Sequence, residues 1–339
     1  MEIVRKKKKM ESDNRPAIEV SNLTKRYGEV VAVNDIGFRI NNGELFGFLG
    51  PNGAGKTTTI NMLTGLARLN AGKINIGGID CTRNTKAAQH LIGVVPDESN
   101  LYPELTGFDN LCFCAALYGI RKDERKKRAQ QLLETFGLKE AADRKFSGYS
   151  KGMKRKLTFA AGIIHQPPIL FLDEPTTGID VASARQVRQI IADLHRQGTT
   201  VFLTTHYIEE AERLCERIAF IVNGKIVRTD RTADLLKPVK GKSVLVLSIS
   251  GGRDNLIQEM APAFPEYLFY SASSREIRVE SDETIGVSPL ARFLEERGIQ
   301  VTEARSYRPS LEDVFVQITG IEAGLMQKDK EGAGGGRNQ

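Results

Sequence analysis

The chain has 339 residues, of which 40% are hydrophobic and 27% are charged, and its formal net charge is +6. This length allows a large core and more than one domain, and the composition is ordinary for a globular protein. No run approaches the roughly 20 apolar residues of a transmembrane helix, and no apolar stretch follows the basic segment Arg5–Lys9 as in a secretory signal. The four cysteines show neither zinc spacing nor a CxxC pair, which favours reduced thiols in a cytoplasm.

The positive charge is local rather than general. Much of the excess lies in Arg5–Lys9 and Arg121–Arg128, which we interpret as a solvated tail and a solvated helix face. The two ends, residues 1–15 and 321–339, are polar and are expected to be disordered. Between them the sequence predicts two domains, residues 16–240 and 241–320.

The first domain alternates strands and helices. Continuous apolar runs predict strands of a sheet that is covered on both faces, and a tight Asn-Gly turn predicts a hairpin. The expected elements are strands at Glu44–Leu49, Ile169–Leu172 and Thr199–Leu203, a helix from Lys56 through Leu66, and a hairpin of Ile218–Val222 with Ile226-Val227. A helical stretch, about residues 99–165, reads as an insert within this α/β core.

The second domain is predicted to be small and α+β. Expected strands are Ser243–Ser248, Tyr267–Ser271, Glu276–Glu280 and Gln300–Ala304, and expected helices are Asn255–Phe264 and Pro289–Arg297. The sequence SLED at Ser310–Asp313 fits a capping box that opens a last helix.

The segment that follows the first predicted strand matches the phosphate-binding pattern GxxxxGK[ST]. It consists of Gly50, Pro51, Asn52, Gly53, Ala54, Gly55, Lys56, Thr57 and Thr58. Glycines let the backbone curl so that several N–H groups and a helix N-terminus face a polyphosphate. Lys56 is expected to place its charge on the β- and γ-phosphates, and the Thr57 hydroxyl to bind Mg²⁺.

A second candidate element is the pair Asp173 and Glu174, which follows the apolar strand ILFL. The carboxyl ends of strands in α/β sheets are where ligands bind, so Asp173 is expected to hold Mg²⁺ and Glu174 to polarise an attacking water. An exposed acidic turn is the alternative for Asp-Glu-Pro taken alone, and the phosphate loop argues against it.

With both motifs present, the chain resembles the ATP-binding subunits of the ATP-binding cassette (ABC) transporter family. Further motifs follow in the family's order: Tyr27 resembles the residue that stacks on adenine, and Ser150 and Gly152 the signature loop that binds ATP held by a second subunit. Asp180 resembles the loop that joins the two sites, and His206 the switch histidine that contacts the γ-phosphate.

The chain departs from the family pattern at two positions. Lys151 replaces the first glycine of the signature, while Ser150 and Gly152 remain. Asp97 stands where the family has a glutamine that contacts Mg²⁺ and relays the nucleotide state. A carboxylate is also a reasonable ligand for a hard cation, so Asp97 is kept as a metal candidate.

The resemblance implies a P-loop NTPase cassette: a RecA-like core with an antiparallel β subdomain and the helical insert, followed by the small α+β domain. It also implies an ATPase that uses ATP and Mg²⁺, pairs with a second copy or a related cassette, and powers a separate membrane permease from the inner face of the membrane. The C-terminal domain resembles that of exporters of the ABC-2 drug and polysaccharide branch, and Asp97–Thr106 is the candidate docking segment.

An alternative is a soluble ABC-type ATPase that acts on nucleic acid or ribosomes. Such proteins separate the cassette halves with long coiled coils or carry two cassettes, and this sequence shows neither, so no nucleic acid partner is expected. The sequence does not name a cargo.

Overall fold

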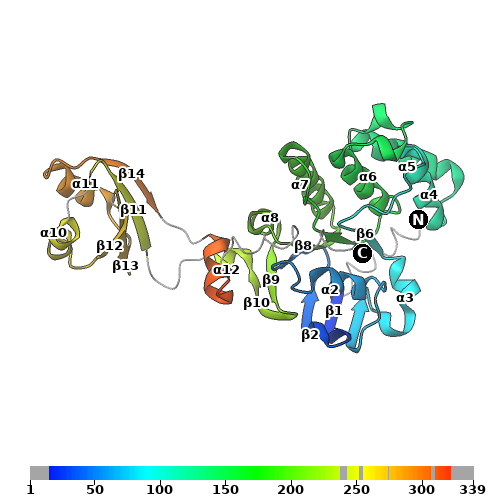
Figure 1. The fold of residues 1–339 in the computed structure, drawn as a ribbon, viewed down its shortest axis with the longest axis horizontal. Coiled ribbons are helices and arrows are strands. Elements are labelled where there is room, and N and C mark those ends of the chain that lie inside the picture. The colour runs from blue at the N-terminus through cyan, green and yellow to red at the C-terminus, as the bar shows by residue number, and fades with distance from the viewer. Residues whose placement is uncertain (1–14, 237–242, 252–254, 274, 307–309, 322–339) are drawn as a thin grey trace, which may run out of the picture. The chain divides into compact units, whose positions relative to one another are not determined.

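The computed structural model describes residues 15–236, 243–251, 255–273, 275–306 and 310–321. Two compact units are present: one runs to Thr232 and resumes at Phe315, and the other is Ala233–Val314 (Figure 1). The ends for which the sequence predicts disorder lie, apart from Arg15 and Ile321, outside the described residues.

The first unit is built on a six-stranded sheet with the strand order β10-β9-β3-β8-β7-β6. Neighbouring strands are parallel except β9 and β10, which form the predicted hairpin. The strands are β3 (Leu45–Leu49), β6 (Ile92–Val95), β7 (Ile169–Asp173), β8 (Thr200–Thr205), β9 (Arg217–Val222) and β10 (Lys225–Arg231). Every residue of β3, β7 and β8 is buried, which confirms the expectation of strands covered on both faces.

A second, antiparallel sheet has the order β2-β1-β4-β5. Its strands are β1 (Ile18–Tyr27), β2 (Val30–Ile40), β4 (Ala71–Ile76) and β5 (Ile79–Asp80). Phe38 of β2 packs against Phe46 and Phe48 of β3 and Phe202 of β8, each with ring centroids 5.8 Å apart. These buried aromatic contacts join the two sheets into one core.

Several helices of the first unit begin at a side chain that accepts a hydrogen bond from the first turn. Thr106 caps α4, Ser150 caps α6 and Asp180 caps α7. The helices are α2 (Lys56–Leu63), α3 (Cys81–Gln89), α4 (Gly107–Leu117), α5 (Lys122–Thr135), α6 (Lys151–Ile163), α7 (Val181–Arg196) and α8 (Ile208–Leu214). The short helix α9 (Thr232–Leu235) begins at the residue where the first unit ends and continues into the second. Figure 1 shows α4, α5 and α6 grouped together beyond β6, where the sequence predicts a helical insert.

Helix α2 is shorter than the sequence predicts. The expected helix ran through Leu66, but α2 ends at Leu63, and Gly65 has a φ of +79°. A residue with this left-handed conformation terminates a helix, and glycine adopts it without strain. Within the described ranges, no helix is long and apolar enough to cross a bilayer.

The second unit contains a four-stranded antiparallel sheet with the order β12-β13-β11-β14. Its elements are β11 (Ser243–Ile249), α10 (Leu256–Ala263), β12 (Leu268–Ser273), β13 (Glu276–Ser281), α11 (Val287–Glu295) and β14 (Val301–Ser306). All four predicted strands and both predicted helices are confirmed, with ends shifted by one or two residues. Alternate residues of β11, namely Leu245, Leu247 and Ile249, face a core completed by Met260 and Leu290.

The last helix, α12 (Leu311–Thr319), begins at the predicted capping box. Ser310 N–H donates to Asp313 Oδ2 at 2.8 Å, and Asp313 N–H donates to Ser310 Oγ at 3.2 Å. Phe315 is fully buried and meets Phe220 of β9 edge-to-face, with centroids 5.6 Å apart. The predicted boundaries of the domains stay a prediction, and the structure adds that α12 from Phe315 onward packs within the first unit.

Phe315→Ala is expected to lower the free energy of unfolding of the first unit by about 3–5 kcal/mol, because it removes a large buried side chain and leaves a cavity beside Phe220. Urea denaturation followed with and without ADP would measure the loss. Tyr270→Ala is the control, since the tyrosine is 47% exposed and its loss should cost under about 1 kcal/mol. Equal effects of the two variants would contradict the assignment of α12 to the first unit's core.

Candidate functional site

The phosphate-binding loop connects β3 to α2 at the carboxyl end of the central sheet. Two of its glycines are required by close approach: a Cβ on Gly50 would lie 2.2 Å from the carbonyl oxygen of Ile221, and one on Gly55 would lie 2.5 Å from that of Ala32. Gly55 also has a φ of +102° and stands at the N-cap of α2. The loop is therefore held against the backbone of both sheets, with the helix N-terminus at its end.

Lys56 is a buried cation whose ammonium group turns back into this loop. Its Nζ donates to the carbonyl oxygens of Gly50 at 2.7 Å and Pro51 at 3.0 Å. The same Nζ lies 3.2 Å from Oε1 of Glu174, and both side chains are less than a tenth exposed. The structure thus places the predicted phosphate-binding lysine next to the predicted catalytic carboxylate.

Glu174 is held by three side chains from different parts of the sequence. His206 Nδ1 donates to Oε2 at 2.6 Å, and Thr177 Oγ1 donates to the same oxygen at 3.0 Å, while Lys56 faces Oε1. Burial alone would raise the pKa of Glu174, but the His206 hydrogen bond and the Lys56 charge outweigh it, and the pKa is lowered. Glu174 is therefore an ionised carboxylate at neutral pH, as a general base must be.

The backbone at Glu174 is unusual, because this residue has a φ of +49°. Such a conformation is uncommon for a residue with a side chain, and it persists only where the surroundings fix it. It directs the glutamate away from the line of β7, toward His206 from the end of β8 and Lys56 from the start of α2.

Asp173 ends β7 and is 4% exposed. The hydroxyls of Thr204 and Thr57 hydrogen bond with its carboxylate. Burial raises the pKa of Asp173, and the nearby negative charges of Glu174 and Asp97 add to the rise. A cation at this position would offset all three unfavourable effects, which is an electrostatic argument for a metal here.

The residues present fit Mg²⁺ better than a metal with an all-protein ligand set. In the parts of the chain that the structure describes, no three His, Cys, Asp or Glu side chains form a group that could hold a metal ion. Mg²⁺ is commonly held by one or two carboxylates together with substrate phosphates and water. Asp173 and the Thr57 hydroxyl lie together, and the Asp97 carboxylate acts electrostatically on Asp173.

The other predicted site residues lie at separate element ends. Tyr27 ends β1 and is 52% exposed, and the Lys25 ammonium lies 4.7 Å from its ring centroid. Ser150 starts α6 and accepts from Met153 N–H at 3.2 Å, and Asp180 starts α7 and accepts from the N–H and hydroxyl of Ser183. The contacts described for these residues are local. The structure therefore does not join Tyr27 or Ser150 to the cluster that it forms from Lys56, Thr57, Asp173, Glu174 and His206.

Three side chains that contact this site were missed by the sequence reasoning. Thr177 and Thr204 bind the two carboxylates, and Arg155 binds the backbone beneath them. For the threonines no local signal exists. Arg155 lies three residues after Gly152 and three before Thr158, which places all three on the buried face of α6, so helical periodicity could have identified it.

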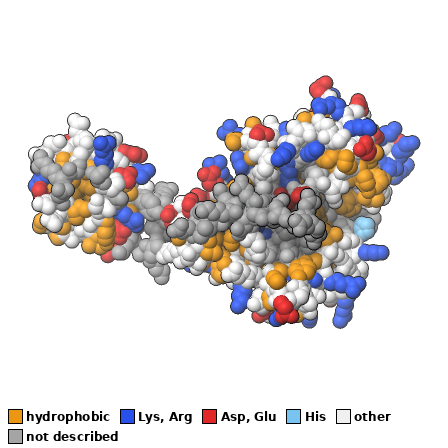
Figure 2. Space-filling view, in the orientation of Figure 1, with side chains coloured by type: hydrophobic (Ala, Val, Ile, Leu, Met, Phe, Trp, Pro, Cys, Tyr) orange, Lys and Arg blue, Asp and Glu red, His pale blue; other side chains and the backbone are white. Residues whose placement is uncertain are grey.

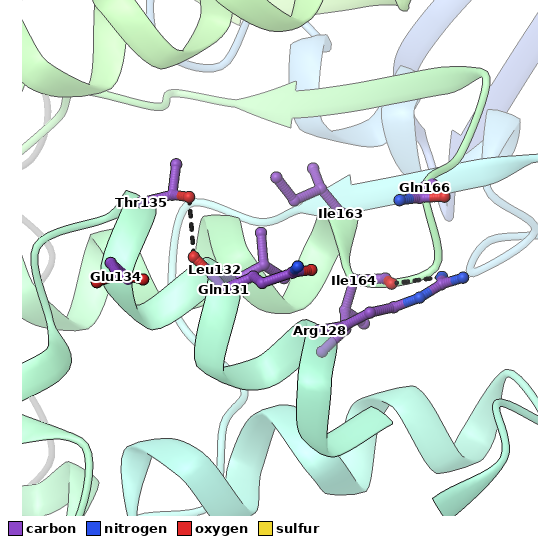
Figure 3. A pocket seen from close by; sticks show the side chains of 8 residues that line it. All are labelled: Arg128, Gln131, Leu132, Glu134, Thr135, Ile163, Ile164 and Gln166. Carbon is purple, nitrogen blue, oxygen red and sulfur yellow. Dashed lines mark hydrogen bonds between the residues drawn. The ribbon is translucent and has the colours of Figure 1, made fainter. Parts of the chain in front are cut away.

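A pocket of about 500 Å³ lies in the helical segment, between α5 and the end of α6. Figure 3 shows Arg128 and Leu132 of α5 facing Ile163 and Ile164, with the Arg128 guanidinium bonded to the Ile164 carbonyl oxygen. None of the predicted site residues lines this pocket, so it is separate from the phosphate-binding loop.

Comparison with known proteins shows the family of this chain. The family model described as "ABC transporter" matches residues 33–177. The chain is 36% identical over 306 residues to the linearmycin resistance ATP-binding protein LnrL of Bacillus subtilis (strain 168), covering 89% of this chain and 98% of that protein. It is 34% identical over 306 residues to the Nod factor export ATP-binding protein I of Rhizobium etli, covering 90% of this chain and 94% of that protein.

Solved structures agree on the fold. A dimeric ATP-binding cassette in a post-hydrolysis state, bound to ADP and Pi, matches with a TM-score of 0.59 and 28% identity, covering 63% of this chain and 98% of that one. The ATP-binding subunit of an ABC transporter matches with a TM-score of 0.60 and 29% identity, covering 65% and 91%. Because it is similar over nearly its whole length to such proteins, the chain belongs to the ATP-binding subunits of ABC transporters, and it is an ATPase that binds ATP.

Proposed function

We propose that this ATPase drives export through a separate membrane-spanning permease, and that Glu174 is the base that activates water for ATP hydrolysis. The observation that carries the catalytic part is the arrangement of Glu174 between Lys56 and His206 beside the phosphate-binding loop. The export direction is supported by similarity over nearly the whole chain to proteins named for drug resistance and for Nod factor export.

In the proposed reaction, the N–H groups of residues 50–58 and the Lys56 ammonium bind the β- and γ-phosphates, and Tyr27 stacks on the adenine. Glu174 orients the attacking water and accepts its proton, and His206 holds the glutamate in place through Nδ1. Mg²⁺ would neutralise charge on the phosphates, with Asp173, Thr57 and Asp97 as the residues to hold it.

The phosphates of ATP and the carboxylate of Glu174 compete for the Lys56 ammonium group. Its ammonium contacts Glu174 at 3.2 Å and also two loop carbonyl oxygens. A polyphosphate carries more negative charge than one carboxylate, so ATP draws Lys56 away from Glu174. The carboxylate, still bonded to His206 and Thr177, then has Oε1 available for water.

Two copies complete the site in this proposal. Ser150 and Gly152 lie at the start of α6 rather than in the Lys56–Glu174 cluster, so they would bind the γ-phosphate of a nucleotide held by another copy or a related cassette. The solved dimer bound to ADP and Pi supports a paired arrangement. Asp180, at the start of α7, would lie between the two sites.

The permease would dock on the helical segment. Tyr102, within the predicted segment Asp97–Thr106, is 51% exposed and packs edge-to-face on Phe113 of α4, which is 38% exposed, with centroids 5.0 Å apart. Leu117, at the end of the same helix, is 70% exposed. Exposed apolar side chains in a group are typical of a surface that binds another protein, and this one would hold the subunit at the inner face of the membrane.

The alternative, a soluble ATPase acting on nucleic acid or ribosomes, would require a basic surface. On the face shown in Figure 2, Lys and Arg side chains are interspersed with acidic and apolar ones instead of forming one continuous patch. Affinity purification from membranes and from the soluble fraction tests the two functions. Co-purification of an integral membrane protein, lost when Tyr102 or Phe113 is substituted, would support the transport function. Co-purification with nucleic acid or ribosomes alone would contradict it.

Asp97→Ala is expected to weaken Mg²⁺-dependent hydrolysis while ATP binding in EDTA is retained or improved. Asp97 lies near enough to Asp173 to raise its pKa, so it adds negative charge to the site that a metal ion compensates. Asp97→Gln should restore most of the activity, because the family's own ligand type returns. The measurement is ATPase rate against Mg²⁺ concentration for the three proteins. Asp123→Ala, an exposed carboxylate on α5, is the control, and superimposable curves for Asp97 and its variants would remove Asp97 from the metal site.

A further inference from the structure

Arg155 of α6 is 5% exposed and uses all five of its N–H donors on backbone carbonyl oxygens. Nε donates to Pro175 at 2.7 Å, and Nη2 donates to Asp173 at 2.9 Å and Glu174 at 3.0 Å. Nη1 donates to Pro96 and, at 2.9 Å, to Asp97. One side chain thus binds the ends of both β6 and β7.

These five bonds hold the backbone that carries the reacting groups. The carbonyl group of Glu174 belongs to the residue with a φ of +49°, and the Arg155 bond fixes the peptide plane that follows it. Asp173 and Asp97, the two metal candidates on these strand ends, are fixed through their own carbonyl oxygens. Burial lowers the pKa of Arg155, and the negative charges of Asp97, Asp173, Glu210 and Glu174 oppose this effect in part.

The other end of this link is the start of α6. Ser150 caps the helix, and Gly152 lies so close to α7 that a Cβ there would be 2.4 Å from Ser183 Oγ and 3.3 Å from Asp180 Oδ2. Arg155 is one turn further along the same helix. The start of α6 and the catalytic strand ends are therefore joined by a stiff helical turn and a saturated guanidinium.

We propose that Arg155 is a positioning residue that couples the two nucleotide sites of the dimer, by transmitting contact of Ser150 and Gly152 with one nucleotide to Glu174, which acts on the other. The inference rests on the proposed two-copy site. In that arrangement Ser150 reaches the neighbour's nucleotide, while Glu174 of the same chain serves its own. A shift of α6 moves the Arg155 donors and with them the Glu174 and Asp97 backbone.

Lysine cannot replace this arginine. An ammonium group has three donors on one atom, whereas the five acceptors are spread over two strand ends and match the planar fork of a guanidinium. Arg155→Lys should therefore keep the positive charge and lose the link. Lys156→Gln, on the next residue, is the matched control, because the described hydrogen bonds of the site do not include Lys156.

The first measurement determines kcat and the affinity for ATP for each variant, at a temperature well below its unfolding temperature. Arg155→Lys should lower kcat at least about 10-fold while ATP affinity of the single chain in EDTA changes less than about 3-fold, since the phosphate loop is not bonded to Arg155. Lys156→Gln should match the wild type in both. Wild-type kcat in Arg155→Lys would overturn the inference, as would equal losses of affinity and kcat.

The second measurement is a double-mutant cycle with Ser150→Ala. If Arg155 transmits the contact of Ser150 with the neighbour's nucleotide, Ser150→Ala should lower kcat when Arg155 is present. In the Arg155→Lys background, the same Ser150→Ala substitution should lower kcat by less than about 2-fold. The same cycle with Lys156→Gln should be multiplicative. Multiplicative losses for Ser150 and Arg155 would show that they act independently and would overturn the coupling.

The controls separate failure of this inference from failure of the proposed function. Unchanged kcat in Ser150→Ala would overturn the two-copy site and this inference together, and normal turnover of Glu174→Gln would overturn the proposed base. If Arg155→Lys does not fold, Arg155→Gln takes its place in the cycle. Failure of both to fold would make Arg155 a purely structural residue, against the inference.

Discussion

Glu174→Gln is expected to lower kcat for ATP hydrolysis by at least about 100-fold while ATP remains bound. The amide keeps the size of the side chain and an oxygen that can accept from His206 or Thr177, but it cannot take a proton from water. Because hydrolysis is blocked, a dimer bridged by ATP should accumulate and be visible by size-exclusion chromatography with ATP and Mg²⁺.

The structure also predicts how Glu174→Gln changes the affinity for ATP. Glu174 pairs with Lys56 at 3.2 Å, so its carboxylate competes with the phosphates for the same ammonium group. Removing the negative charge should tighten ATP binding, measured by titration in EDTA. Glu209→Gln is the control, since Glu209 is 85% exposed on α8 and both measurements should match the wild type. Near-normal turnover of Glu174→Gln would mean that another group activates the water.

Lys56→Ala is expected to weaken ATP binding by more than about 100-fold. Removing one partner of a buried charge pair costs about 3–5 kcal/mol, and the loss of the ammonium from a polyphosphate site is of the same kind. Isothermal titration with ATP would measure it, with Lys73→Ala on the exposed side of β4 as the control. Wild-type affinity in Lys56→Ala would contradict the assignment of the phosphate loop.

Lys56→Ala should also destabilise the fold, because it leaves the buried Glu174 carboxylate without its nearest cation. The double variant Lys56→Ala with Glu174→Gln separates the two effects. Its unfolding temperature should return toward the wild type, since no unpaired charge remains, whereas ATP binding should stay weak. Recovery of binding in the double variant would show that Lys56 acts only by compensating Glu174.

Local patterns predicted most of the fold. Apolar runs identified β3, β7 and β8, the Asn223-Gly224 turn identified the β9–β10 hairpin, and reciprocal capping identified the start of α12. Each of these depends on residues that are neighbours in the chain. The predicted end of α2 at Leu66 is wrong, because the helix ends at Leu63 and Gly65 has a left-handed conformation.

The packing of α12 could not be predicted in the same way. Its sequence SLEDVF shows that a helix starts there, but the contact of Phe315 with Phe220 joins segments separated by the whole second unit. Hydrophobic periodicity shows which side of a helix is buried and not which surface covers it. Arg155 shows the same limit: periodicity can place it on the buried face of α6, but it does not show that its acceptors are the backbone carbonyl oxygens at the ends of β6 and β7.

The sequence by itself determined the chemistry of each motif: a glycine-rich loop that binds phosphate, a strand that ends in two carboxylates, and a serine that caps a helix. These are local properties, set by backbone conformation and by side chains a few residues apart. Only the tertiary structure decided that Lys56, Glu174 and His206 form one cluster. That cluster depends on the strand order β3-β8-β7, which places three carboxyl ends side by side, and long-range strand pairing is not encoded in any local pattern.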